Sequence, residues 1–254
     1  MKKDLLNSFI LTILVIANLQ MTEAFSTPTL GPFFSRPRDA ISKTTEAEEA
    51  PTIHFETYDQ AMAVVDRAAD HPNNIHKANL YAAVHFLEHF SYKLYDTPAA
   101  QEELWKRAHG SFALVLSTGS AQSHDFHPPP KFLPFSYAMI DDTHFGNGIG
   151  SDAQHIWISM LQKHHYEPVH RRMVVTLKDI YFRGKKVTDK VPGWMKRKLH
   201  VGMQPDEFTE APPPTFVIIA ASDKALVARG NQSGGLAIWA RLQDDIRPVA
   251  YQRD

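Results

Sequence analysis

The spacing of apolar residues divides the chain into a helical part and a strand-rich part. From about residue 57 to residue 109, apolar side chains recur every three or four positions, which predicts amphipathic helices. Thr97 and Pro98 predict the start of one helix, because threonine caps a helix end and proline fits the first helical position. From about residue 110 to residue 245 the apolar period changes to two, which predicts strands.

Short apolar runs in the second part are separated by turn sequences such as Gly234-Gly235. The predicted strands cover residues 111–118, 132–140, 155–161, 172–182, 215–221, 225–228 and 236–242. The segment from Asp141 to Gly148 is interpreted as an acidic turn. Because helices do not alternate with the strands, the pattern argues against a doubly wound α/β sheet. We therefore predict an α+β protein in which a helical segment precedes an antiparallel barrel or sandwich.

The first 50 residues have the pattern of a two-part targeting sequence. Two lysines precede an apolar run, Phe9 to Leu19, that is too short to span a bilayer, and small residues precede Phe25. Residues 1–24 are therefore predicted to be a signal peptide. Residues 25–50 are predicted to be a transit peptide and linker, because they begin with basic, hydroxyl-rich sequence. The domain itself would occupy residues 51–254.

Composition narrows the function classes. The chain has a formal net charge of -1, which gives no electrostatic reason to expect a nucleic acid partner. It contains no cysteine, which excludes disulfides, thiolate metal sites and cysteine nucleophiles. No P-loop, G-x-S-x-G or G-x-G-x-x-G motif is present. We therefore predict no cofactor and no enzymatic activity.

Three segments resemble the plastid lipid-associated proteins, or fibrillins. The most specific runs from Ser222 to Trp239, where a short strand ends in Arg229-Gly230 before a turn and a last apolar strand. Residues 110–118 resemble the opening strand of that family, and residues 171–177 resemble its central strand. The resemblance implies a lipocalin-like barrel behind a helical segment. It also implies binding of an apolar small molecule, namely a lipid, quinone or carotenoid, at a thylakoid or plastoglobule surface.

The targeting sequence agrees with this resemblance. An aromatic residue at the first transit position, here Phe25, resembles the leaders of complex plastids that are reached through the secretory route. We therefore expect a plastid location, with secretion as the alternative.

Alternate residues of the predicted strands are expected to face the barrel interior and bind the ligand. These residues are Phe112, Leu114, Leu116, Trp157, Val175, Phe216, Ile218 and Trp239. Arg229 is expected to close the barrel by packing over Phe112, with a polar ligand head group as its alternative partner. Gly230 is expected to supply a positive φ in the following turn.

A basic and aromatic group follows the central strand. Trp194, Lys196, Arg197 and Lys198 have the composition of a segment that docks on an anionic membrane surface, and the alternative is a solvated loop. A lipid-particle coat protein without an internal cavity is therefore another hypothesis.

One sequence motif favours a different function. His85, Glu88 and His89 match the H-x-x-E-H pattern, in which two histidines one helical turn apart bind zinc and the glutamate acts as general base. A zinc-dependent hydrolase is therefore the main alternative. The surrounding aromatic residues favour a helix that packs on the barrel, and we assign no metal or catalytic residue.

Overall fold

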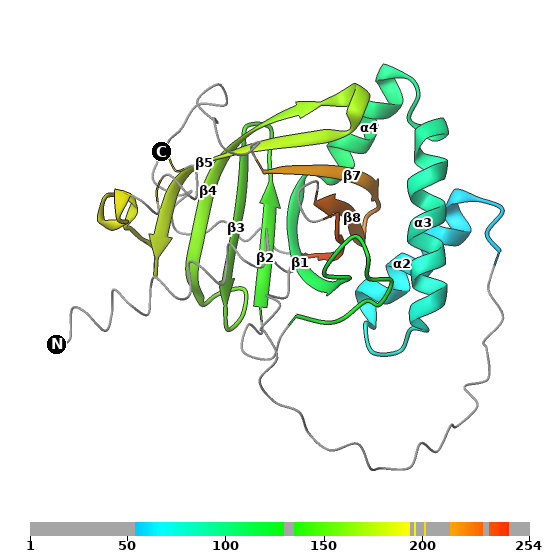
Figure 1. Ribbon diagram of the computed structural model, residues 1–254, viewed down its shortest axis with the longest axis horizontal. Helices are drawn as coiled ribbons and strands as arrows, with labels where there is room; N and C mark the ends of the chain where they lie inside the picture. The colour runs from blue at the N-terminus through cyan, green and yellow to red at the C-terminus, as the bar shows by residue number, and fades with distance from the viewer. Residues whose placement is uncertain are drawn as a thin grey trace, which may run out of the picture.

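The computed structural model describes residues 54–129, 135–193, 196, 201, 214–230 and 234–243. The predicted targeting sequence lies outside the described residues. The described chain consists of a helical part followed by strands that close into a barrel (Figure 1).

Local sequence signals define the helices. They are α2 (Tyr58–Asp70), α3 (Lys77–Leu94) and α4 (Pro98–Ala108). A capping box starts α2: the Thr57 hydroxyl accepts from the Gln60 backbone N–H, and the Gln60 side chain accepts from the Thr57 N–H. At α4, Thr97 is the N-cap and Pro98 the first helical residue, as predicted.

The strands form one closed antiparallel ring. They are β1 (Gly110–Ser117), β2 (Phe135–Ile140), β3 (His144–Gly150), β4 (Ile156–Glu167), β5 (Arg172–Phe182), β6 (Lys185–Lys186), β7 (Thr215–Ala221), β8 (Ala225–Gly230) and β9 (Leu236–Arg241). The order is β4-β3-β2-β1-β9-β8-β7-β5, and β4 also pairs with β5, which completes the ring. The short β6 lies beside β5. The predicted fold class, helices followed by a lipocalin-like antiparallel barrel, is confirmed.

Two aromatic residues identify the inner face of the barrel. β3 and β7 are not neighbours in the ring, yet the ring centroids of Phe145 and Phe216 lie 5.6 Å apart. Side chains on these two strands meet only by pointing into the barrel. Residues that share a face with them in the strand register therefore line the lumen, and alternate residues face outward.

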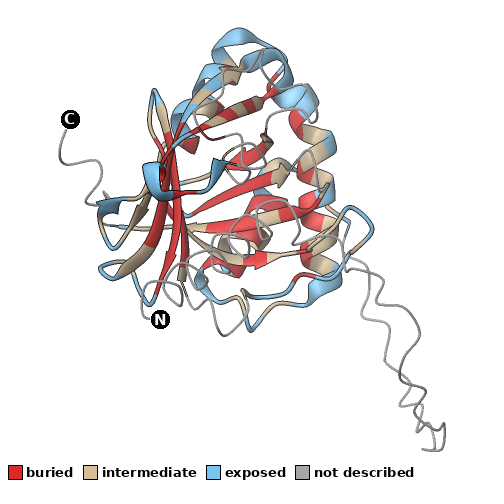
Figure 2. Cartoon of the chain, turned by 60° about the vertical axis from the view of Figure 1, so that its left-hand side comes forward, coloured by how far each residue is buried: buried red, intermediate tan, exposed pale blue. Residues whose placement is uncertain are grey.

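Helices α2 and α3 cover the outer face of the strands near the C-terminus. Outward-facing Ala220, Val227 and Ile238 form one buried cluster with apolar residues of both helices, including Val65 and Leu80. The helix surfaces that face the strands are buried and the opposite surfaces are exposed (Figure 2). Helices α2 and α3 are thus attached mainly to the outside of the barrel.

Strand β3 corrects one prediction. The acidic turn is shorter than expected, because Asp141 accepts hydrogen bonds from the backbone of Thr143 and His144 and the strand begins at His144. Its glycines reflect packing: a Cβ on Gly148 would lie 2.6 Å from the Tyr137 ring and 2.3 Å from a backbone oxygen. Residues that look like a flexible turn in the sequence therefore let two strands and an aromatic side chain approach closely.

Candidate functional site

The lumen has an apolar wall. Six of the eight residues predicted to face inward belong to one cluster at the helical end of the barrel. They are Phe112, Leu114, Val175, Phe216, Ile218 and Trp239. Phe145 and Met173 complete this wall from β3 and β5.

The other two predicted residues have different positions. The prediction for Leu116 is wrong, because a bulge between Leu114 and Leu116 turns Leu116 to the outer face, where it packs with the helices. Trp157 is the extra residue of a bulge in β4, because Ile156 and Ile158 both pair with β3 while Trp157 does not. It packs, partly buried, against a second cluster.

That second cluster occupies the opposite end of the lumen. It is formed by Ile149, Ile158, Met160, Leu177, Ile180, Val191 and Val201. Between the two clusters the buried Gln162 donates to the side-chain oxygen of Asn147 over 3.0 Å. Because these hydrogen-bonded amides carry no charge, this part of the lumen suits an uncharged portion of a ligand.

Part of the lumen wall is in contact with solvent. Leu114, Phe216 and Ala237 face inward from β1, β7 and β9, yet each is only partly buried. Apolar surface that faces a lumen and is still wetted gains free energy when an apolar molecule covers it. A bound apolar ligand would therefore gain the most binding free energy at this accessible wall.

Aromatic side chains cover the helical end of the lumen. Trp105 of α4 stacks on Tyr166 with centroids 4.2 Å apart and planes 10° apart. It also makes edge contacts with His109 and His164. β4 continues to Glu167, beyond the predicted strand end at residue 161, and His164 is partly buried. Helix α4, which lies outside the barrel, thus contributes the Trp105 indole ring to the end of the barrel.

Burial favours the neutral form of these histidines. It lowers the pKa of His164, although the nearby Asp141 opposes the shift, and it lowers the pKa of His109. The His164 Nε2 lies 2.7 Å from the Asp141 carbonyl oxygen, which can only accept, so Nε2 carries the proton. A second proton would go to Nδ1, which is buried without a hydrogen-bond partner.

We expect acid to destabilise the protein through this histidine. A folded-state pKa below the ordinary 6.5 means that the unfolded chain binds more protons, so the free energy of unfolding falls as pH drops below 6.5. His164→Gln should reduce this fall, measured by urea denaturation between about pH 7.5 and about pH 5.5. His165→Gln, at the exposed next position, is the control. An equal fall in the wild type and the His164 variant would contradict the assignment.

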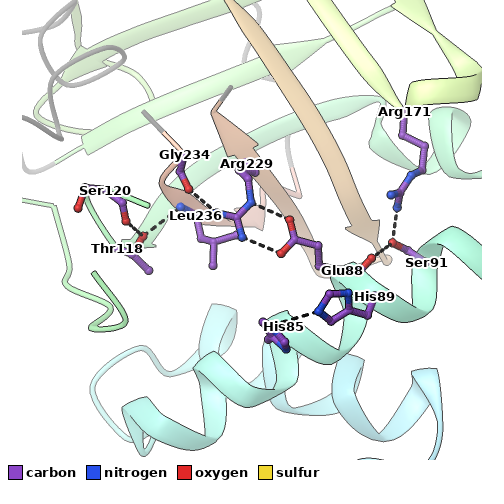
Figure 3. A network of polar contacts seen from close by, with 10 residues as sticks. All are labelled: His85, Glu88, His89, Ser91, Thr118, Ser120, Arg171, Arg229, Gly234 and Leu236. Atoms are coloured by element: carbon purple, nitrogen blue, oxygen red, sulfur yellow. Dashed lines mark hydrogen bonds and ion pairs between the residues drawn. The ribbon is translucent and has the colours of Figure 1, made fainter. Parts of the chain in front are cut away.

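The predicted role of Arg229 is wrong, because this residue forms an ion pair with α3. Its guanidinium donates twice to the Glu88 carboxylate, over 2.7 and 2.6 Å, and also donates to the Gly234 carbonyl (Figure 3). The guanidinium over Phe112 belongs to Arg241, 4.6 Å from the ring centroid. The positive φ predicted for Gly230 is found at Gly234, with φ 67°.

The same ion pair argues against the zinc hypothesis. Glu88 faces Arg229, whereas the Nε2 atoms of His85 and His89 lie 3.2 Å apart on another side of α3 (Figure 3). In the described part of the chain, no group of three or more His, Asp or Glu side chains is arranged to hold a metal ion. The two histidines line an outer groove of about 430 Å³ together with His54, Phe55, Tyr81, Ala82 and Phe86. The predicted general base is therefore absent from the histidine pair.

The proposed membrane-docking segment is only partly visible. Trp194, Arg197 and Lys198 lie outside the described residues, and Lys196 is partly buried. Among the helices that are described, none has the length and apolar composition needed to cross a membrane. Docking by this segment remains a prediction.

Comparison with known proteins adds one structural similarity. No model of a known protein family matches the chain, and no curated protein matches it. A crystal structure of a lipocalin-like protein from Bacteroides uniformis is similar over 54% of this chain and 99% of its own, with 10% sequence identity and a TM-score of 0.33. The strand order, closed by the pairing of β4 with β5, defines the barrel. The resemblance to fibrillins remains a resemblance of short segments.

Proposed function

We propose that the protein binds an apolar small molecule, such as a lipid, quinone or carotenoid, in the lumen of its barrel. It holds or carries this molecule and catalyses no reaction on it. The observation that supports this proposal best is the partly solvent-accessible apolar wall at Leu114, Phe216 and Ala237. Each methylene group that leaves water against such a wall contributes about 0.8 kcal/mol, so a medium-sized apolar ligand binds without any charged contact.

The structure offers a matched pair of variants for testing lumen binding. Ala237→Phe places a ring at the accessible wall, whereas Ala113→Phe adds the same volume on the outer face of β1. With decylplastoquinone as probe and quenching of tryptophan fluorescence as readout, we expect Ala237→Phe to weaken binding at least about 10-fold, because the ring occupies the ligand volume. Ala113→Phe should change the affinity by less than about twofold.

Two results would count against lumen binding. One is equal weakening by both variants, which would place the probe elsewhere. The other is the absence of saturable binding of decylplastoquinone and of β-carotene to the folded wild-type protein. Binding to liposomes without either ligand would favour the coat-protein hypothesis instead.

We also propose that the protein acts inside a plastid, at a thylakoid or lipid-droplet surface. The targeting pattern of residues 1–50 supports the location, and the basic segment around Lys196 supports the surface. A fusion of residues 1–50 to a fluorescent protein should enter the plastid of an alga with a red-lineage secondary plastid. Phe25→Ala should hold the fusion outside the plastid, and Phe33→Ala is the control. Import that does not depend on Phe25 would contradict this part of the proposal.

A further inference from the structure

A buried cation lies at the helical end of the barrel. Arg171 is only 2% exposed and follows the short helix η1 (Pro168–His170) with a positive φ of 50°. Its Nη1 donates to the Ser91 hydroxyl of α3 (Figure 3). Its guanidinium lies 4.1 Å from the centroid of the Tyr92 ring. These contacts hold the guanidinium in place, and neither partner carries a negative charge.

Arg171 differs from the arginines around it. Arg172 pairs with Glu167, and Arg107 pairs with Glu103. No carboxylate among the described residues pairs with Arg171, and its Nη2 is buried without a hydrogen-bond partner. Burying a guanidinium without a counter-charge is unfavourable, so an anion at this position would be bound strongly.

A second unused donor belongs to the lumen itself. Tyr166 packs against the apolar cluster and stacks on Trp105, and its hydroxyl is buried without a partner. Burial raises the pKa of Tyr166 to about 12, so the hydroxyl is protonated at neutral pH and can donate. The positive charge of Arg171 acts on this hydroxyl and partly opposes the shift. In the strand register Tyr166 lies opposite Met173, two residues after Arg171, so the cation and the phenol lie at the same end of the β4–β5 hairpin.

We propose that Arg171 and Tyr166 bind the carboxylate of an amphipathic ligand, a long-chain fatty acid or a lipid with the same head group, whose apolar chain lies in the lumen. This inference rests on the proposed function and specifies the ligand class. The two oxygens of a carboxylate match the two unused donors, and its single negative charge matches the single unpaired cation. The apolar wall then receives the chain, and the two donors Arg171 Nη2 and Tyr166 OH gain a partner.

The charge count favours a carboxylate over a phosphate monoester. A phosphate monoester brings up to two charges and three oxygens. Tyr95 lies at the same end of the barrel, and the charges of both Arg107 and Arg171 act on it. Arg107 already pairs with Glu103. Arg171 thus has one charge to offer, which a carboxylate neutralises.

The test compares ligands that differ only in the head group. Palmitate, hexadecanol and hexadecyl phosphate are titrated into the full-length protein by calorimetry. We expect palmitate to bind about 10- to 100-fold more tightly than hexadecanol, as a charge-assisted pair of hydrogen bonds predicts. Hexadecyl phosphate should bind no more tightly than palmitate.

The Tyr166→Phe variant separates an effect on head-group recognition from an effect on the stability of the fold. It removes only the hydroxyl, which has no partner in the free protein, so the free energy of unfolding should stay equal or rise. The affinity for palmitate should fall about 10-fold while that for hexadecanol changes less than about twofold. Tyr95→Phe is the matched control: its hydroxyl donates to Tyr58 over 3.1 Å, so this variant should lose stability and keep the preference for palmitate.

Arg171→Met should abolish the preference for palmitate over hexadecanol. Retention of the preference in both Tyr166→Phe and Arg171→Met would overturn the inference, as would equal affinity of the wild type for acid and alcohol. In both cases lumen binding itself would survive, because hexadecanol still binds. If none of the three ligands binds, the proposed function fails with the inference. Tighter binding of hexadecyl phosphate would replace the carboxylate by a phosphate.

Discussion

Phe112→Ala should lower the free energy of unfolding by about 3–5 kcal/mol, the range for removing a fully buried phenylalanine from a packed core. Phe112 is 0% exposed and belongs to the lumen wall. It also lies beneath the guanidinium of Arg241, whose Nη1 donates to the His109 carbonyl over 2.7 Å. The substitution therefore removes both apolar contacts and the support of an arginine that connects β9 to the end of α4.

Chemical denaturation with tryptophan fluorescence measures this loss. Val169→Ala is the control, because Val169 is 75% exposed and its truncation should cost less than about 0.5 kcal/mol. Phe112→Leu should give an intermediate value, since it keeps most of the buried apolar surface. A loss for Phe112→Ala below about 1.5 kcal/mol would show that the lumen is not packed around this ring.

Glu88→Gln should cost about 2–3 kcal/mol of unfolding free energy. Removing one partner of a fully buried ion pair costs about 3–5 kcal/mol, and this pair is somewhat more accessible, with side-chain exposures of 25% for Arg229 and 20% for Glu88. The substitution leaves the guanidinium partly buried without its counter-charge. It also weakens the bidentate link between α3 and β8.

An exposed pair in the same protein provides the comparison. Lys106 and Glu102 lie one turn apart on α4 and are both 64% exposed, so Glu102→Gln should cost less than about 0.5 kcal/mol. The double variant Glu88→Gln with Arg229→Met should lose less than the sum of the single variants, because the second change removes the unpaired cation. Additive losses would mean that the two side chains do not interact in solution.

The elements of this fold that could be predicted are those determined by residues close together in the sequence. The capping residues Thr97 and Pro98 gave the start of α4, and alternating apolar residues gave most strands to within a few residues. β3 was missed because a run of glycines has no strand pattern of its own. Its conformation depends on Tyr137 and the β4 backbone, which lie elsewhere in the sequence.

The candidate site shows the same limit. Inward positions such as Phe112 and Trp239 follow from alternation, but Leu116 does not, because a single bulge reverses the face of every later residue in the strand. The sequence contains several arginines near strand ends. Only register and packing decide that Arg241 covers Phe112 and that Arg229 pairs with Glu88. They also decide that Arg171 is buried at the end of the hairpin that carries Tyr166.

The pairing of β1 with β9 has a consequence for how the chain folds. Phe112 lies opposite Arg241, so the first strand of the ring acquires its second neighbour only when the last strand arrives. Until then β1 and β8 each present an unpaired backbone edge that can join another chain. Because contacts between such distant segments form slowly, assembly is expected to be slow and prone to aggregation before the ring closes. Truncation before Leu236 would leave this intermediate as the end state.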